Sequence, residues 1–592
     1  MNRTLKIKKF NENFIKTVFY IAALFSIIAV AAIFVFLFIQ GIPAISKIGL
    51  FNFLLGSKWD ILHGIDYYTS STLQGSYGIA TTIIGTVYVT LFATLIGGVI
   101  GVFTAIFLSR FCPKKLKNIL SQLVNLLAGI PSVIYGFFGL NVIQPLLGKF
   151  SDNGSGTGIL SVSIILAIMI LPTIIAISKN SLDAVPDSYY EASRALGDSH
   201  SQSVFGAILP AAKSGIVTSI ILGVGRAIGE TMAVALLCGN ATVFPNGMFG
   251  AFSTMTSHIV NGLGELQPNQ VAFGAMVATG FVLFIFVLII NLLFQFVNRK
   301  RDDNKKTYRT GFFKNKSKIF AVFLKCLSYI TSILSIVSLG IIVLYIFIKG
   351  LPNITSSMFA ITGTYSGSPT ILPSIISTLM LVFLSLIIAV PIGIGASIFL
   401  SEYTKSSNKL IKVIRIGIET LASIPSIIYA LFGAAFFVYA LKFGVSILSG
   451  ALTISLMIIP VIIRSCEESL KTVPDSYREG SYALGSGKIR TIFKIIIPSA
   501  LSGILSSVIL SIGRIVSESA PLLFTMGGGK MTIIPTSFMS SGTSLSVLMY
   551  AFSGENKYMN ECWATASILL IIIFTLNLLS TLIVRKFNIK KR

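Results

Sequence analysis

Apolar windows, each long enough to cross a lipid bilayer as a helix, recur along this chain and constrain its fold most. One helical crossing needs about 20 apolar residues. Such windows lie near 17–40, 79–108, 118–145, 158–178, 214–238 and 271–297, and again near 324–348, 372–400, 413–441, 444–464, 502–525 and 563–584. Only 11% of the residues are charged, against about 25% in a soluble domain. The sequence therefore predicts an all-α polytopic membrane protein with about 12 transmembrane helices in two sets of six.

The basic residues predict how the helices are oriented. Lysine and arginine number 46 against 21 acidic residues, and nine of them lie in the segment 298–318. The segment 239–270 has none. Because basic residues collect in cytoplasmic loops, we expect both termini and the central linker to be cytoplasmic. The same bias explains the net charge of +25 without a nucleic-acid partner. The five cysteines are scattered, which argues against a metal site.

The two sets of six windows are related in sequence. VPDSYYEASRALGD (185–198) matches VPDSYREGSYALGS (473–486) at ten of fourteen positions, with an offset of 288. GIPSVIYGFFG (129–139) matches SIPSIIYALFG (423–433). This pattern indicates a parallel duplication, with one half over 1–297, a basic linker over 298–323 and a second half over 324–592. The prolines of the Ile-Pro-Ser segments are expected to kink the third helix of each half, and Ser132 and Ser426 could line a pathway.

The longest cytoplasmic connection within each half predicts a short, well-delimited helix. Its start fits an S-x-x-E capping box, and a glycine after it fits a left-handed helix end. The residues concerned are Ser188, Glu191 and Gly197 in the first half and Ser476, Glu479 and Gly485 in the second. Capping alone would account for the glutamates. A rigid helix with Tyr, Ala and Leu on its surface also suits docking of a soluble partner.

A charged pair lies within the fifth apolar window of each half. The pairs are Arg226 with Glu230 and Arg514 with Glu518. A charge at mid-bilayer costs about 2.5–3.5 kcal/mol on insertion scales. Residues four apart share a helix face, so each pair is expected to form within one helix. The alternatives are an ion pair that only fixes packing, or two arginines facing a central pathway and suited to an oxyanion, with the glutamates keeping its affinity low.

The cytoplasmic helices resemble the EAA loop of ABC importer permeases. The first copy has Glu191-Ala192-Ser193, then Gly197 and Leu209-Pro210; the second has Glu479-Gly480-Ser481, then Gly485 and Ile497-Pro498. This resemblance implies a coupling helix that docks into a groove of an ATPase subunit. The chain has no Walker-type GxxxxGK[ST] segment. We therefore expect no cofactor in this chain, with ATP and Mg on a separate ATPase.

The fifth-window segments resemble a narrower family. GRAIGETMAVALLCGN (225–240) is similar to the C-type permease of phosphate-specific transport (Pst) systems, and GRIVSESAPLLFTMGG (513–528) to the A-type. The resemblance implies a type I importer (MetI-like) fold and a role in phosphate passage for the two charged pairs. It also implies two ATPase copies, an extracytoplasmic phosphate-binding protein, and the plasma membrane of a prokaryote. The chain would do no covalent chemistry and would not be an enzyme.

Three other functions remain open from the sequence. The same machine could carry another oxyanion such as sulfate or molybdate. An ATP-independent secondary transporter with parallel repeats would leave the two cytoplasmic helices unexplained. A structural membrane scaffold would leave the duplicated charges unexplained.

Overall fold

The computed structural model describes residues 2–60, 76–151, 154–264, 271–302, 318–361, 370–404, 409–529 and 533–589. The chain divides into two compact units. The first-repeat unit is Pro43–Pro352, and the second-repeat unit combines Met1–Ile42 with Asn353–Arg592. Each unit is described by itself.

The first-repeat unit is a bundle of helices with one two-stranded antiparallel ribbon, β1 with β2. Its elements in chain order are α2 (Leu50–Leu55), β1 (Trp59–Asp60), β2 (Ser76–Tyr77), α3 (Ala80–Ile106), η1 (Phe107–Phe111), α4 (Lys114–Leu127), α5 (Ser132–Phe138), η2 (Gly139–Ile143), α6 (Gln144–Gly148), α7 (Ile159–Asp183), α8 (Asp187–Ala195), α9 (His200–Ser203), η3 (Val204–Ile208), α10 (Leu209–Ala211), α11 (Lys213–Gly229), α12 (Met232–Leu237), α13 (Met255–Leu263), α14 (Val271–Asp302) and α15 (Lys318–Gly350).

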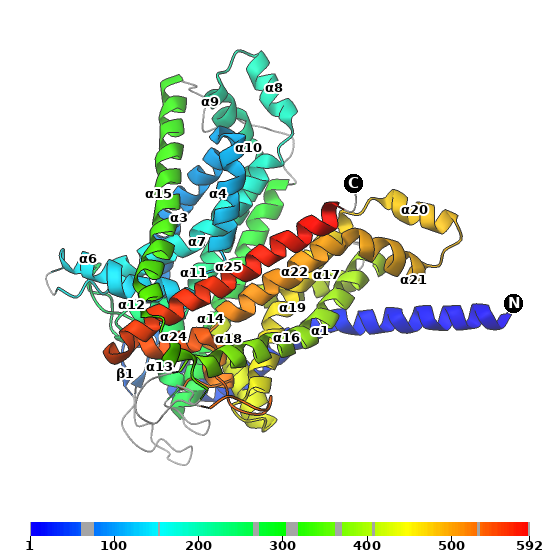
Figure 1. The fold of residues 1–592 in the computed structure, drawn as a ribbon. Coiled ribbons are helices and arrows are strands. Elements are labelled where there is room, and N and C mark those ends of the chain that lie inside the picture. The colour runs from blue at the N-terminus through cyan, green and yellow to red at the C-terminus, as the bar shows by residue number, and fades with distance from the viewer. Residues whose placement is uncertain are drawn as a thin grey trace. The chain divides into compact units, whose positions relative to one another are not determined.

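From α16 to α25 the second-repeat unit follows the order of the helices from α3 to α14 (Figure 1). Its elements are most of α1 (Asn2–Ile48), then η4 (Leu351–Asn353) at the unit boundary, η5 (Ser356–Phe359), α16 (Leu372–Ile398), η6 (Phe399–Tyr403), α17 (Lys409–Ser423), α18 (Ser426–Gly433), η7 (Ala434–Ala440), α19 (Ile447–Lys471), α20 (Asp475–Ala483), α21 (Lys488–Thr491), η8 (Ile492–Ile496), α22 (Ile497–Ser517), α23 (Ala520–Thr525), α24 (Leu545–Ser553), η9 (Asn556–Tyr558) and α25 (Met559–Ile589).

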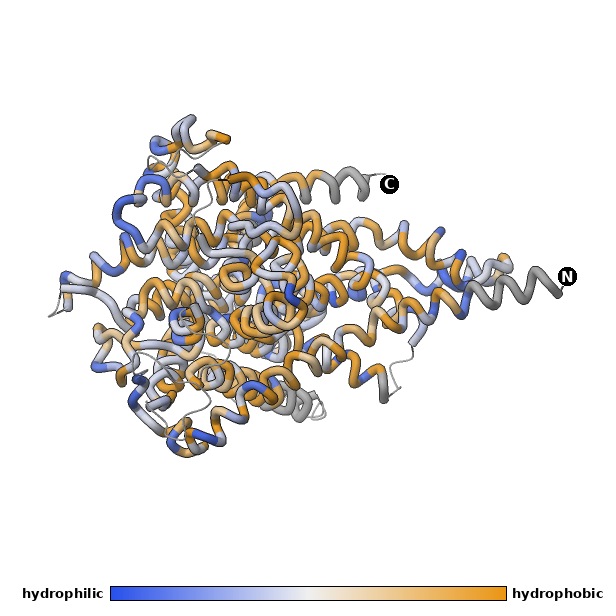
Figure 2. Tube along the Cα trace, turned by 90° about the horizontal axis from the view of Figure 1, so that it is seen from below, coloured by the Kyte–Doolittle hydropathy of each residue, from blue (hydrophilic) through white to orange (hydrophobic). Residues whose placement is uncertain are grey.

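The long helices are apolar enough to cross a membrane. Among the described residues nine helices pass that test by length and composition, or up to eleven when two strongly bent pairs each count as one span. Figure 2 shows hydrophobic residues along these helices and hydrophilic residues gathered at their ends and in the connections. The prediction of an all-α polytopic membrane protein is confirmed.

The third window of each half is not the single kinked helix that we expected. In the first-repeat unit α4 ends at Leu127 and α5 begins at Ser132. In the second-repeat unit Ile411–Ser423 and Ser426–Ala440 are bent by 96°. The prolines between them, Pro131 and Pro425, have ψ of 142° and 144°. Such extended backbone cannot continue a helix, and a proline offers no N–H to the preceding turn.

A buried tyrosine forms a hydrogen bond across each of these breaks. Tyr135 Oη donates to the Leu127 carbonyl at 3.2 Å, and Tyr429 Oη donates to the Leu421 carbonyl at 2.5 Å. Both tyrosines are fully buried. Each adds a side-chain donor to a carbonyl near the helix end that otherwise accepts only a backbone N–H three residues later, from Ile130 or Ile424. The motif Ile-Pro-Ser-x-Ile-Tyr therefore contains both the proline at which the helix breaks and the tyrosine that hydrogen-bonds across the break.

The first helix of each repeat packs in the unit of the other repeat. Phe19 and Tyr20 of α1 lie with ring centroids 6.4 Å from Tyr403 and 5.3 Å from Phe399, at the end of α16. In the first-repeat unit Tyr329 of α15 lies 4.8 Å from the Phe107 ring. The compact units therefore differ from the sequence halves 1–297 and 324–592 by an exchange of first helices, and the boundaries of those halves stay a prediction.

Glycines let the inner helices of each unit approach closely. A Cβ at Gly97 of α3 would lie 2.9 Å from the Ala167 carbonyl oxygen of α7. A Cβ at Gly215 would collide with Ser181, and one at the equivalent Gly503 would collide with Ser469. Small residues at helix crossings are the usual means of close packing in membranes.

Candidate functional site

The fifth helix of each unit ends at the charged pair. In the first-repeat unit α11 ends at Gly229, and Glu230 has φ −71° and ψ 133°. In the second-repeat unit α22 ends at Ser517, and Glu518 has φ −79° and ψ 140°. The expectation of continuous helices over 214–238 and 502–525 is therefore wrong. Each glutamate lies in extended backbone between two helices, one residue beyond the helix that carries its arginine.

A hydroxyl from a short later helix explains why the break is stable. Thr256 Oγ1, on α13, donates to the Glu230 carbonyl at 2.7 Å. Ser546 Oγ, on α24, donates to the Glu518 carbonyl at the same distance. These side chains replace the i+4 backbone donor that a continuous helix would supply. The structure thus shows one arrangement twice: a broken helix, a glutamate at the break, and a hydroxyl that caps its carbonyl.

These short helices are themselves fixed to the second span of their repeat, α3 or α16. The Met255 N–H donates to Thr86 Oγ1 at 3.0 Å, and the Leu545 N–H donates to Thr378 Oγ1 at 3.0 Å. The sequence analysis missed these hydroxyl contacts. A signal was present, because Ser-Thr-Met-Thr (253–256) and Thr-Ser-Leu-Ser (543–546) place hydroxyls in the same pattern. The backbone at each glutamate is therefore capped by a short helix that is itself hydrogen-bonded to another span.

The two arginines have different partners. In the first-repeat unit an Arg226 guanidinium N–H donates to Thr173 Oγ1 of α7 at 2.9 Å. In the second-repeat unit Arg514 Nε lies 3.7 Å from Glu518 Oε1, and these side chains are 35% and 20% exposed. The predicted pairing of Arg514 with Glu518 is confirmed, although not within one continuous helix.

The carboxylate of Glu230 is held by groups around the two helix breaks. The Ser132 side chain, at the start of α5, lies close to it. The Ala233 N–H donates to Glu230 Oε1 at 3.5 Å. The serine of the Ile-Pro-Ser segment, predicted as a pathway residue, therefore contacts one of the predicted site residues.

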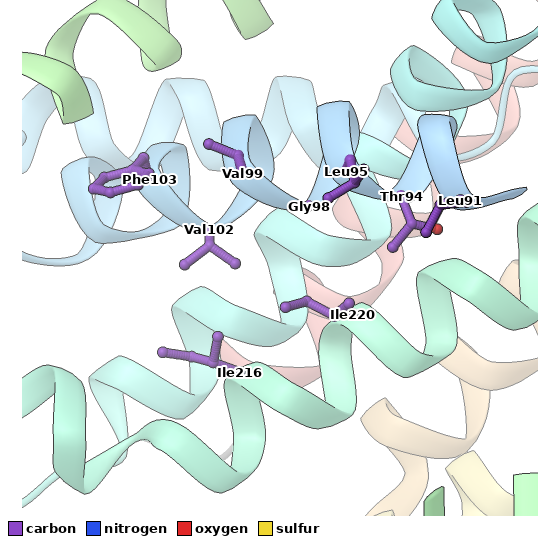
Figure 3. A pocket seen from close by; sticks show the side chains of 9 residues that line it. All are labelled: Leu91, Thr94, Leu95, Gly98, Val99, Val102, Phe103, Ile216 and Ile220. Carbon is purple, nitrogen blue, oxygen red and sulfur yellow. The ribbon is translucent and has the colours of Figure 1, made fainter. Parts of the chain in front are cut away.

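An apolar groove lies between α3 and α11 of the first-repeat unit (Figure 3). Its volume is about 400 Å³. It is lined by Leu91, Thr94, Leu95, Gly98, Val99, Val102, Phe103, Ile216 and Ile220. With no charged side chain in the lining, this groove does not suit an anion.

The predicted cytoplasmic helices are α8 and α20, each near one end of its unit (Figure 1). Gly197 and Gly485 follow them with φ of 89° and 75°, which confirms the predicted left-handed ends. The predicted capping boxes are wrong. Pro186 and Pro474 occupy the N-cap positions without a side-chain cap, because the helices begin two residues earlier than the boxes require. Ser188 and Ser476 therefore lie inside the first turn.

The EAA positions of both helices lie mostly on the surface. Four of them are exposed: Glu191, Ala192, Glu479 and Gly480. The third positions, Ser193 and Ser481, are buried and donate or share hydrogen bonds with Asp198 and Thr491 at 2.7 and 2.8 Å. The buried serines fix each helix to its own loop, so the exposed positions are free to meet another protein.

Leu196 and Leu484 follow the last turns of α8 and α20 and are 85% and 88% exposed. An exposed leucine at the same place in both repeats gives each helix an apolar contact point. Such a point suits a protein partner better than water.

Comparison with known proteins assigns the family. Residues 97–303 and 389–592 both match the family described as "Binding-protein-dependent transport system inner membrane component". The chain belongs to this family. As a member it is a multi-pass permease subunit of an ABC transporter, a class that works with ATPase and substrate-binding partners. The duplication predicted from sequence corresponds to two matches to one family.

Among its relatives is the "Phosphate transport system permease protein PstA homolog" of Mycoplasma pneumoniae, 26% identical over 80% of this permease and 81% of the relative. The "Phosphate transport system permease protein PstC" of Haemophilus influenzae is 32% identical over 50% of this permease and 98% of the relative. A chain from a structure of the MetNI methionine ABC transporter is 19% identical, with a TM-score of 0.29 over 37% of this permease and 94% of that chain. The predicted resemblance to C-type and A-type Pst permeases is confirmed by the first two.

Proposed function

We propose that this permease carries inorganic phosphate into the cytoplasm as the membrane subunit of an ATP-driven importer. The observation that carries the proposal is the repeated site at the broken fifth helices, where Arg226 and Arg514 each stand four residues before the glutamate at the break. The names of the two Pst relatives support phosphate as the substrate.

The chemistry of the site fits transient binding of an oxyanion. A guanidinium presents several N–H donors in one plane and stays charged at any physiological pH. Glu230 and Glu518 place negative charge near the same position, which limits the affinity for an anion. A conduit needs that limit, because an ion that is bound too tightly does not leave. We assign both arginines and both glutamates to the phosphate pathway.

The energy for transport is proposed to come from two copies of a separate ATPase that dock on α8 and α20. The exposed EAA positions and the exposed leucines Leu196 and Leu484 support this. ATP and Mg would bind to the ATPase and not to this chain. An extracytoplasmic phosphate-binding protein would deliver the substrate.

The orientation in the membrane follows from the basic residues. Because lysine and arginine concentrate in 298–318 and at both ends of the chain, we propose that both termini are cytoplasmic, in the plasma membrane of a prokaryote.

Reconstitution tests the function. The chain would be placed in proteoliposomes with its ATPase and its binding protein, and uptake of labelled phosphate, sulfate and molybdate would be followed with and without ATP. We expect ATP-dependent uptake of phosphate that sulfate and molybdate do not compete. Preferred uptake of sulfate or molybdate would reassign the substrate. Uptake that needs no ATPase would make the protein a secondary transporter.

A further inference from the structure

A buried ion pair ties the coupling helix α20 to the end of span α16. Glu402, in η6 at the end of α16, accepts two hydrogen bonds from Arg478 in α20. Arg478 Nη2 lies 2.8 Å from Glu402 Oε1 and Arg478 Nε lies 3.3 Å from Glu402 Oε2. The two side chains are only 4% and 16% exposed. Such a two-point contact fixes orientation as well as distance.

Arg478 also reaches two other elements. Its Nη1 donates to the Val473 carbonyl at 2.7 Å and its Nη2 to the Leu470 carbonyl at 3.1 Å. Asp475, at the start of α20, lies 3.1 Å from Nη1. The hydrogen bonds to Glu402 raise the pKa of Arg478 above its usual value. One side chain therefore joins α16, the end of α19 and α20.

The first repeat has different residues at these positions. IFLSRF (106–111) aligns with IFLSEY (398–403), so Arg110 stands where the second repeat has Glu402. The offset of 288 places Tyr190 where the second repeat has Arg478. An arginine facing a tyrosine cannot form the same ion pair.

The contacts at α8 are of a different kind. Arg110 donates to the Leu182 carbonyl at 2.6 Å and lies 3.7 Å from Asp187, which is 83% exposed. Tyr190 Oη shares a hydrogen bond of 2.9 Å with His200 Nδ1, and His200 Nε2 lies 3.1 Å from the Arg110 carbonyl oxygen. An ion pair at that distance, with the Arg110 side chain 16% exposed but its partner open to solvent, contributes little stability. The two coupling helices are thus attached to their spans by different contacts: a two-point ion pair at α20, and a single weak ion pair with a hydrogen-bonded histidine at α8.

We propose that Glu402 and Arg478 are positioning residues, whose ion pair (the latch) holds α20 rigidly against the end of α16. Through the latch, the second repeat passes motion of the docked ATPase to its spans more directly than the first repeat does. The proposal rests on the proposed function, because it needs an ATPase docked on α20. A motion of the ATPase reaches a span only if the docked helix moves together with that span. With the latch broken, α20 would remain joined to α19 through residues 472–474 and could tilt without moving α16.

A graft between the repeats tests the latch without leaving a buried charge unpaired. The variant Glu402→Arg with Arg478→Tyr gives the second repeat the residues of the first, and Glu402→Gln with Arg478→Met removes both charges. The control is Arg464→Met, which breaks the exposed pair Arg464–Glu468, 3.6 Å apart with side chains 60% and 73% exposed. The measurement is the amount of phosphate imported per ATP hydrolysed in proteoliposomes with ATPase and binding protein.

We expect both double variants to reach the membrane, bind the ATPase and hydrolyse ATP, while phosphate imported per ATP falls by roughly 5-fold or more. The control should equal wild type. If both double variants transport as efficiently per ATP as wild type, the latch has no role in coupling. If wild type itself shows no ATP-driven phosphate uptake, the proposed function fails instead.

Hydrogen exchange of the coupling helices tests the effect of the Glu402–Arg478 ion pair without a transport assay. We expect backbone amides of 475–483 to exchange more slowly than those of 187–195 in the wild-type chain. The double variants should remove that difference. Equal exchange of the two helices in the wild type would overturn the proposal whatever the substrate is.

Discussion

Replacing Thr173 with valine tests how Arg226 is positioned. The Thr173 hydroxyl accepts a hydrogen bond of 2.9 Å from the guanidinium, and valine keeps the branched shape while removing the acceptor. A hydrogen bond to a charged group contributes about 1.5–3 kcal/mol. Because Arg226 is only half-buried and has other N–H donors, we take the lower end, which corresponds to roughly a tenfold loss of rate. The second repeat supports the choice of valine, because Val461 stands at the position equivalent to Thr173. The arginine of that repeat, Arg514, pairs with Glu518 instead.

The assay is the initial rate of labelled phosphate uptake, normalised to the amount of protein in the membrane. Thr279→Val is the matched control, because its hydroxyl donates to the Ala275 carbonyl of its own helix at 2.9 Å. The control should keep the wild-type rate within about twofold, given a net value near 1 kcal/mol for such a bond. A Thr173→Val variant that transports at the rate of Thr279→Val would refute the idea that Thr173 orients the arginine.

Three further changes test other parts of the structure. Ser546→Ala removes the hydroxyl that caps the Glu518 carbonyl at the helix break. It should cost about 1 kcal/mol of stability, seen as a lower melting temperature in detergent. The control Ser506→Ala, whose hydroxyl donates to a carbonyl of its own helix at 2.9 Å, should melt closer to wild type. Gly503→Val overfills a close helix crossing and should cost about 1–3 kcal/mol, whereas Gly340→Val, with open space around it, should not; equal melting of the two would contradict the packing argument. Leu484→Asp should leave the melting temperature unchanged and weaken ATPase binding roughly tenfold, measured by co-purification; unchanged binding would remove this residue from the docking surface.

Part of this architecture could be predicted from the sequence because it repeats. The offset of 288 aligned the charged pairs and the cytoplasmic helices. Hydropathy alone predicted that the chain is an all-α polytopic membrane protein. Gly197 and Gly485 were predictable as helix ends because glycine tolerates a positive φ.

The helix breaks could not be predicted, because distant side chains stabilise them. A proline in an apolar window fits a kink as well as a break, and the Leu127 carbonyl at the end of α4 accepts a hydrogen bond from Tyr135, eight residues later. The break at Glu230 depends on Thr256, which is 26 residues away in sequence. The exchange of first helices depends on tertiary packing and has no local signal.

Phosphate uptake by the double variant Arg226→Gln with Arg514→Gln tests the central claim most directly. Cells that lack their own high-affinity phosphate importer would express this chain with its ATPase and its binding protein, with labelled sulfate as a parallel substrate. The account predicts ATP-dependent phosphate uptake by the wild type and uptake at background by the double variant, with both proteins equally abundant in the membrane. Wild-type uptake rates in the double variant would contradict the account, since the arginines would then serve only helix packing.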